Sequence, residues 1–196
     1  MVELIIFIVI VGIAVIGVLG LLSYTTRNSV DPLLRKQALA IAEGLLEEVA
    51  LARFTYCDPN DASAGTATSA TIGAGACTSI VENVGPEPAT ASHAANTRPY
   101  DNVNDYVSRF GVEESAFDID GVLADASGNK FGAREQLRAY KATLMITAES
   151  LNGIAATGDA ATMDVVRMSV KVSYNGGRDA VTLDGFRTRH SPTAVP

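Results

Sequence analysis

The sequence predicts an α+β protein in which a long N-terminal helix packs, through its second half, on a C-terminal antiparallel β-meander. Three patterns in its 196 residues predict this fold class. An uncharged apolar run extends from Leu4 to Leu22, apolar residues recur at helical spacing after Pro32, and apolar and polar residues alternate from Tyr140 onward. Helical segments followed by strand segments are typical of α+β domains.

The first helix is expected to cross a membrane. The run from Leu4 to Leu22 holds about 19 residues, which at ~1.5 Å per residue give roughly 28 Å, against a hydrocarbon core of ~30 Å. A cleaved secretory signal would need a basic n-region, a shorter apolar core and an A-x-A-like cleavage site, and the segment has none of these. We therefore expect a single-pass anchor bounded by Leu4 and Leu22.

A second helical segment is predicted after the polar break at residues 23–29. Asp31 and Pro32 supply an N-cap residue and a proline at the first helical position. Apolar residues then recur every three or four positions, at Leu34, Ala38, Ile41, Leu45, Val49 and Ala52. This stripe is expected to lie on the sheet.

The two cysteines lie in a stretch that has no helical or strand period. From residue 57 to about residue 96 turn formers and small polar residues dominate, which predicts a surface loop. Cys57 and Cys77 suit one disulfide in an oxidising compartment, and closing a loop of about 20 residues would stabilise the fold by roughly 3 kcal/mol. Two free thiols are the alternative. Residues 100–106 are expected to form a short turn-rich or helical element.

Three strands are predicted near the C-terminus. Residues 140–148 and 166–174 alternate between apolar and polar side chains, Asn175-Gly176-Gly177 favours a hairpin turn, and residues 180–187 form the returning strand. The sequence thus predicts four parts, which are a transmembrane helix at 1–24, an amphipathic helix at 25–56, a variable loop region at 57–139 and the sheet at 140–196.

Composition and motifs argue against several functions. The net charge of -7 and the scattered basic residues disfavour nucleic-acid binding. His93 and His190 are the only histidines, and there is no Gly-rich phosphate loop or Cys-x-x-Cys, so we expect neither an enzyme nor a cofactor. Asp118 and Asp120 resemble part of a calcium loop, but the other oxygen ligands and the closing Glu are missing. We interpret this segment as a turn and predict no metal site, and these two residues remain the calcium candidates.

Glu3 is a carboxylate at the start of a membrane-spanning run, which is costly in lipid unless it stays at the interface or finds a cation. The run Met1-Val2-Glu3-Leu4-Ile5-Ile6 resembles the end of the N-terminal methylation motif of type IV prepilins, in which Gly and then Phe-Thr-Leu-Val-Glu-Leu precede an apolar helix. The resemblance implies that Glu3 pairs with the N-terminal amine of a neighbouring subunit in a filament. An interfacial Glu3 that faces water is the alternative.

The motif lacks its basic leader, the Gly and the Phe upstream of Met1. We expect that this start is internal and that a prepilin peptidase processes a longer chain. Arg27, Arg35 and Lys36 follow the span, so the positive-inside rule taken alone would place the C-terminal domain in the cytoplasm. The cysteines and the family resemblance favour the periplasm, which is our expectation.

Three further patches resemble the D-protein family of mannose-sensitive haemagglutinin (MSHA) pilus biogenesis, namely residues 29–34, 100–106 and 168–189. The resemblance implies a minor pilin that is anchored in the inner membrane, assembles with other pilins through its N-terminal helix and has its place in the pilus. A minor pseudopilin of a type II secretion system is one alternative. A membrane-anchored periplasmic binding domain that never polymerises is the other.

Overall fold

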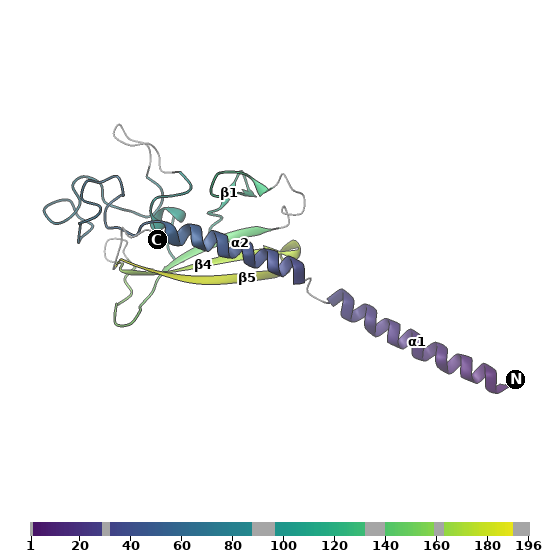
Figure 1. Ribbon diagram of the computed structural model, residues 1–196. Coiled ribbons are helices and arrows are strands. Elements are labelled where there is room, and N and C mark those ends of the chain that lie inside the picture. The colour runs from purple at the N-terminus through teal and green to yellow at the C-terminus, as the bar shows by residue number, and fades with distance from the viewer. Residues whose placement is uncertain (1, 29–31, 88–96, 132–139, 159–162, 190–196) are drawn as a thin grey trace. The chain divides into compact units, whose positions relative to one another are not determined.

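The computed structural model describes residues 2–28, 32–87, 97–131, 140–158 and 163–189 (Figure 1). The chain divides into two compact units, residues 1–33 and residues 34–196. The first unit holds a single long helix. The second is an α+β domain with a helix, a three-stranded antiparallel sheet and a region of loops.

The first unit is the helix α1, Val2–Asn28. Its large apolar side chains from Val2 to Leu22 are all exposed, by 41% at Val11 to 73% at Ile16. The helix continues through the polar residues from Ser23 to Asn28, where the sequence predicted a break. These residues contain no Pro or Gly to end a helix, so polarity alone was a poor stop signal. The predicted N-cap residue Asp31 lies outside the described residues.

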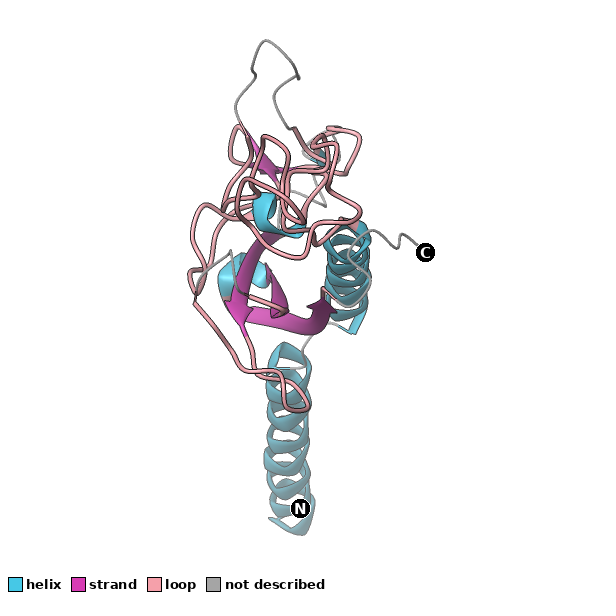
Figure 2. Ribbon diagram, turned by 90° about the vertical axis from the view of Figure 1, so that its left-hand side faces the viewer, coloured by secondary structure: helices cyan, strands magenta, loops and turns pink. Residues whose placement is uncertain are grey.

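Helix α2, Pro32–Leu51, begins at the predicted proline. Its buried side chains recur at spacings of four and three residues, and all but one belong to the predicted stripe: Ala38, Ala42, Leu45 and Val49. They join one hydrophobic core with the side chains of the sheet, so α2 packs on a face of the sheet (Figures 1 and 2). Ala42, which the predicted stripe left out, is part of this contact.

The sheet is a meander in the order β3-β4-β5, formed by Lys141–Ala148, Val165–Tyr174 and Asp179–Thr188. In its register Leu144 lies opposite Val170, and Val170 lies opposite Leu183. Since side chains alternate along a strand, such partners share one face, and it is this face that enters the core. The predicted strands and their antiparallel pairing are confirmed.

The turn between β4 and β5 is also confirmed. Asn175, Gly176 and Gly177 all have positive φ angles, of 52°, 67° and 83°. Asn and Gly adopt this region at little steric cost, which explains why this tripeptide reverses the chain.

A short 3₁₀ helix and a small hairpin lie between α2 and the sheet in sequence, within residues 97–131. The 3₁₀ helix η1, Val103–Tyr106, confirms the short helical element predicted at residues 100–106. Strands β1, Asp118–Ile119, and β2, Val122–Leu123, form a two-residue hairpin at Asp120-Gly121. The prediction of a turn at this calcium-like segment is therefore confirmed.

The segment around the two cysteines differs from the surface loop that the sequence predicted. No helix or long strand forms within residues 57–87, as predicted, but Cys57 and Cys77 are fully buried in a small cluster with Ala64. Several polar side chains are buried beside them: Thr55, Asp58, Asp61 and Glu82. Loop residues can be buried here because hydrogen bonds within the loop satisfy the backbone without a regular ladder.

Candidate functional site

The residues from Leu4 to Leu22 lie within α1, and the apolar segment from Val2 to Tyr24 is long and apolar enough to cross a membrane. Glu3 lies in the first turn of this helix and is exposed. A carboxylate in the first turn interacts favourably with the positive end of the helix dipole. The helix therefore presents one negative charge at its start and an apolar surface beyond it.

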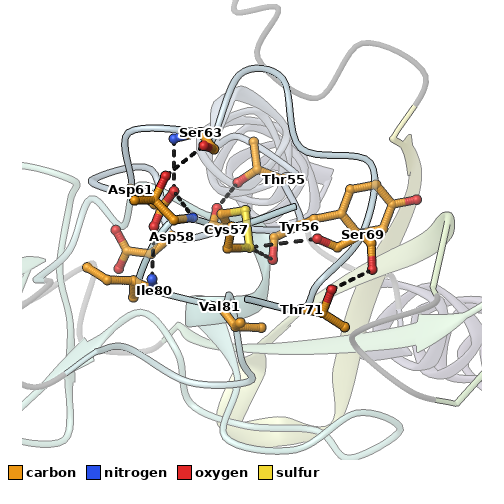
Figure 3. Close-up of a disulfide and its surroundings, with 12 residues drawn as sticks. Thr55, Tyr56, Cys57, Asp58, Asp61, Ser63, Ser69, Thr71, Ile80 and Val81 are labelled. Atoms are coloured by element: carbon orange, nitrogen blue, oxygen red, sulfur yellow. Dashed lines mark hydrogen bonds between the residues drawn. A yellow bond between two sulfur atoms is a disulfide. The ribbon is translucent and has the colours of Figure 1, made fainter. Parts of the chain in front are cut away.

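The predicted disulfide is present. Cys57 and Cys77 are bonded, with their Cα atoms 5.5 Å apart, and the bridge is surrounded by Tyr56, Thr55 and Val81 (Figure 3). The two bonded cysteines are separated by 20 residues in the sequence.

Asp61 organises the same loop, although no pattern in the sequence singles it out. Its two carboxylate oxygens accept four backbone N–H bonds, drawn in part in Figure 3, from Ser63 (2.8 Å), Thr78 (3.0 Å), Ser79 (2.7 Å) and Ile80 (2.8 Å). Burial alone would raise the pKa of Asp61, but these donors outweigh it and hold the pKa well below the ordinary value. A buried ionised carboxylate thus joins the two sides of the disulfide loop.

Three other carboxylates converge beyond this loop, at Glu82, Glu87 and Asp105. One oxygen of each lies within 4.8 Å of the others. Glu82 and Asp105 are each 2% exposed, and Glu87 is half-buried. Carboxylate oxygens at this spacing could hold a metal ion.

Backbone hydrogen bonds bring these carboxylates together from two segments. The Glu82 N–H donates to the Tyr56 carbonyl (3.1 Å), and the Gly85 N–H donates to the Asn104 carbonyl in η1 (3.1 Å). The Asp105 Oδ2 accepts the N–H of Asn102 (3.1 Å), which caps the start of η1. Asp105 is therefore held by the short helix, and the glutamates by the loop that follows the disulfide.

The surroundings of the cluster are acidic. Burial is the main cause that raises the pKa of Glu82, followed by the charges of Asp105, Glu87 and Asp58. Burial, Glu87 and Asp101 likewise raise the pKa of Asp105. The guanidinium of Arg189 acts on Glu82 electrostatically.

Arg189 is bound to other groups. Its Nε donates to the Met163 carbonyl and its Nη1 to the Thr55 carbonyl, each at 2.6 Å. The same guanidinium stacks on the rings of Phe54 and Tyr56, at 4.2 and 4.3 Å from their centroids. These contacts join the end of β5 to the residues that enter the disulfide loop.

The two calcium candidates from the sequence lie elsewhere. Asp120 is exposed on the β1-β2 hairpin and forms an ion pair with Lys130 at 2.6 Å. Asp118 begins β1, and neither residue belongs to a group of three metal-ligating side chains within the part of the chain that the structure describes. Glu82 and Glu87 lie in a loop without a helical or strand period, so the sequence offers no ligand spacing for them. Asp105 lies in the short element predicted at residues 100–106.

A groove lies along one side of α2. Its volume is about 970 Å³, and its lining includes Ile41, Gly44, Leu51, Tyr100 and Phe131. Apolar grooves of this size are typical of binding surfaces in general.

Comparisons with protein-family models, with curated proteins and with solved structures find no match to this chain.

Proposed function

We propose that this chain is a minor pilin of the MSHA pilus type, anchored in the inner membrane through α1 before that helix packs against the helices of other pilins. One observation carries the proposal: the large apolar side chains of α1 are all exposed from Val2 to Leu22. An apolar surface of this extent needs lipid or other apolar helices around it. Membrane anchoring followed by helix packing supplies both.

Glu3 places a negative charge at the start of α1, which a simple membrane anchor does not need. In the packed core of a filament, a carboxylate at the start of α1 requires a cation, and the N-terminal amine of the next subunit would provide one. Such pairing would set the axial register between subunits. This role of Glu3 rests on the resemblance of residues 1–6 to the prepilin motif.

The second unit supports a periplasmic location. The bridge between Cys57 and Cys77 is buried, and disulfides persist in oxidising compartments. The helix-on-sheet domain of residues 34–196 is the part that would lie on the filament surface.

The proposal is tested by replacing Glu3→Ala in the native host. We expect the variant to insert in the inner membrane at the wild-type level and to be absent from sheared filaments, because register is lost while the apolar surface is intact. Immunoblots of carbonate-washed membranes and of the sheared fraction measure both quantities. Glu43→Ala removes an exposed carboxylate from α2 instead and serves as the matched control.

Incorporation of the Glu3→Ala chain at the wild-type level would contradict the role of Glu3. If the wild-type chain itself never enters filaments, the membrane-anchored binding domain becomes the better account, and the groove along α2 is then its candidate surface. The intact mass and N-terminal sequence of the protein from its native membrane supply a second test. A methylated Phe two residues before Met1 supports processing by a prepilin peptidase.

A further inference from the structure

We propose that Glu82, Glu87 and Asp105 bind one Ca²⁺ ion. This inference concerns residues 34–196 alone and holds whether or not the chain enters a filament. It places a calcium site between the loop that follows the disulfide and the helix η1. Asp118 and Asp120, the candidates from the sequence, are not part of it.

The geometry of the three carboxylates suits a calcium ion. Calcium binds oxygen ligands at about 2.3–2.6 Å, so two ligands on opposite sides of the ion lie up to roughly 5 Å apart. One oxygen from each of Glu82, Glu87 and Asp105 lies within 4.8 Å of the others. A single ion can therefore contact all three without movement of the backbone.

Glu82 supplies an independent reason to expect a ligand. Its side chain is 2% exposed, and neither carboxylate oxygen has a hydrogen-bond partner among the described residues. A buried carboxylate without a partner costs several kcal/mol, so native proteins pair it, protonate it or bind a metal with it. Since one of these oxygens points to the carboxylates of Glu87 and Asp105, a cation at this position would satisfy it.

The negative charges around Glu82, Glu87 and Asp105 favour the binding of a cation. Asp58 and Asp101 add further negative charge, and the guanidinium of Arg189, which acts on Glu82, is bound to two carbonyl groups and two aromatic rings. Three charged carboxylates this close to one another repel each other. Binding of a divalent ion removes this repulsion.

The ligand chemistry selects calcium among the common divalent ions. All three side chains offer hard oxygen ligands, whereas structural zinc sites use Cys and His. Magnesium prefers a regular octahedron and retains most of its water, while calcium accepts irregular sets of six to eight oxygens. Loop carboxylates supplemented by water and backbone carbonyls form such an irregular set.

The test uses the full chain in detergent micelles, freed of metal with EDTA and titrated with CaCl₂ in a calorimeter. We expect one binding site per chain. We also expect the midpoint of thermal unfolding, followed by circular dichroism, to rise by roughly 5–10 °C at a hundredfold excess of Ca²⁺ over Kd. Glu82→Gln keeps the shape of the side chain and removes its charge, and it should weaken binding by at least about tenfold.

Two further variants make the result decisive. Glu87→Gln changes the half-buried ligand, so it tests the site even if Glu82→Gln fails to fold. Asp120→Asn removes the exposed hairpin carboxylate, and it should bind Ca²⁺ as the wild type does. The proposal is overturned if CaCl₂ causes neither heat of binding nor a thermal shift, or if the Glu82 and Glu87 variants both retain wild-type affinity.

Discussion

At the scale of single residues, Asp61 illustrates how one side chain organises a segment that lacks regular structure. Its carboxylate is 5% exposed and collects N–H groups from both sides of the disulfide loop. Hydrogen bonds to an ionised acceptor are about twice as strong as those between neutral groups. The conformation of the loop therefore depends on the negative charge of Asp61 as well as on the disulfide.

This dependence predicts a pH effect on stability. The pKa of Asp61 is lower in the folded than in the unfolded chain, so its ionised form stabilises the fold above the unfolded pKa of ~3.9, and that stabilisation is lost as the pH falls below it. Asp61→Asn should lower the free energy of unfolding by about 2 kcal/mol at pH 7 and by less at pH 3. Urea unfolding in detergent at both pH values measures the difference.

Asp120→Asn is the control for this experiment, because Asp120 is exposed and its pKa is lowered by Lys130 on the surface. We expect it to leave the urea midpoint at pH 7 close to that of the wild type. An Asp61→Asn variant as stable as the wild type at pH 7 would show that the loop is held by the disulfide and its packing instead.

At the scale of elements, Arg98 connects α2 to the β1-β2 hairpin. Its Nε and Nη2 each bind a carboxylate oxygen of Glu48 at 2.7 Å, and its Nη1 donates to the carbonyls of Phe117 and Ala124 at 2.8 Å. The two charged side chains are only 9% and 10% exposed. The ion pair is thus buried, and Arg98 donates four hydrogen bonds within it and to the two carbonyls, which is the geometry in which such pairs tolerate burial.

We expect Arg98→Ala to lower the free energy of unfolding by about 3 kcal/mol, because it leaves Glu48 buried without its cation. Tyr106, whose hydroxyl donates to Glu48 at 3.1 Å, compensates only in part. In a double-mutant cycle, Arg98→Ala and Glu48→Ala should together cost clearly less than the sum of the two single changes. Urea unfolding followed by circular dichroism provides the four values.

The exposed pair of Lys171 and Glu113, 3.2 Å apart on the outer side of the sheet, offers a matched comparison. Its coupling energy should stay below about 1 kcal/mol, since solvent screens exposed charges. Strict additivity at Arg98 and Glu48 would mean that the connection between α2 and the hairpin depends on packing alone.

At the scale of the whole molecule, the two compact units have different requirements for their surroundings. Residues 34–196 contain a hydrophobic core that joins α2 to the sheet, and residues 1–33 expose an apolar helix. We predict that a fragment of residues 32–196 remains monomeric without detergent and unfolds in one cooperative transition. The full chain should aggregate once detergent is removed.

Size-exclusion chromatography and thermal unfolding of the fragment and of the full chain test this prediction. A fragment that also aggregates without detergent would show that the groove along α2, or another surface of residues 34–196, drives association when it is exposed to water. In that case the apolar surface of α1 is not the sole cause of association.

The helices and strands of this fold were largely predictable from the sequence, whereas the clusters of buried polar side chains in its loops were not. Alternation predicted β3, β4 and β5, and helical spacing predicted α2 and three of its four buried residues, Ala38, Leu45 and Val49. The disulfide was predictable because the chain has only two cysteines. By contrast, the sequence predicts a surface loop from residue 57 to about residue 96, since small polar residues give no sign of burial when their partners are backbone groups.

The sequence by itself determined the apolar helix, the helix-on-sheet layout and the pairing of Cys57 with Cys77, since periodicity and composition act over neighbouring residues. Only the tertiary structure decided that Asp61 would hold the disulfide loop and that Glu82, Glu87 and Asp105 would converge. The physical reason is that such clusters form where irregular segments meet. Their positions follow from backbone hydrogen bonds between those segments, and no local pattern in the sequence records these bonds.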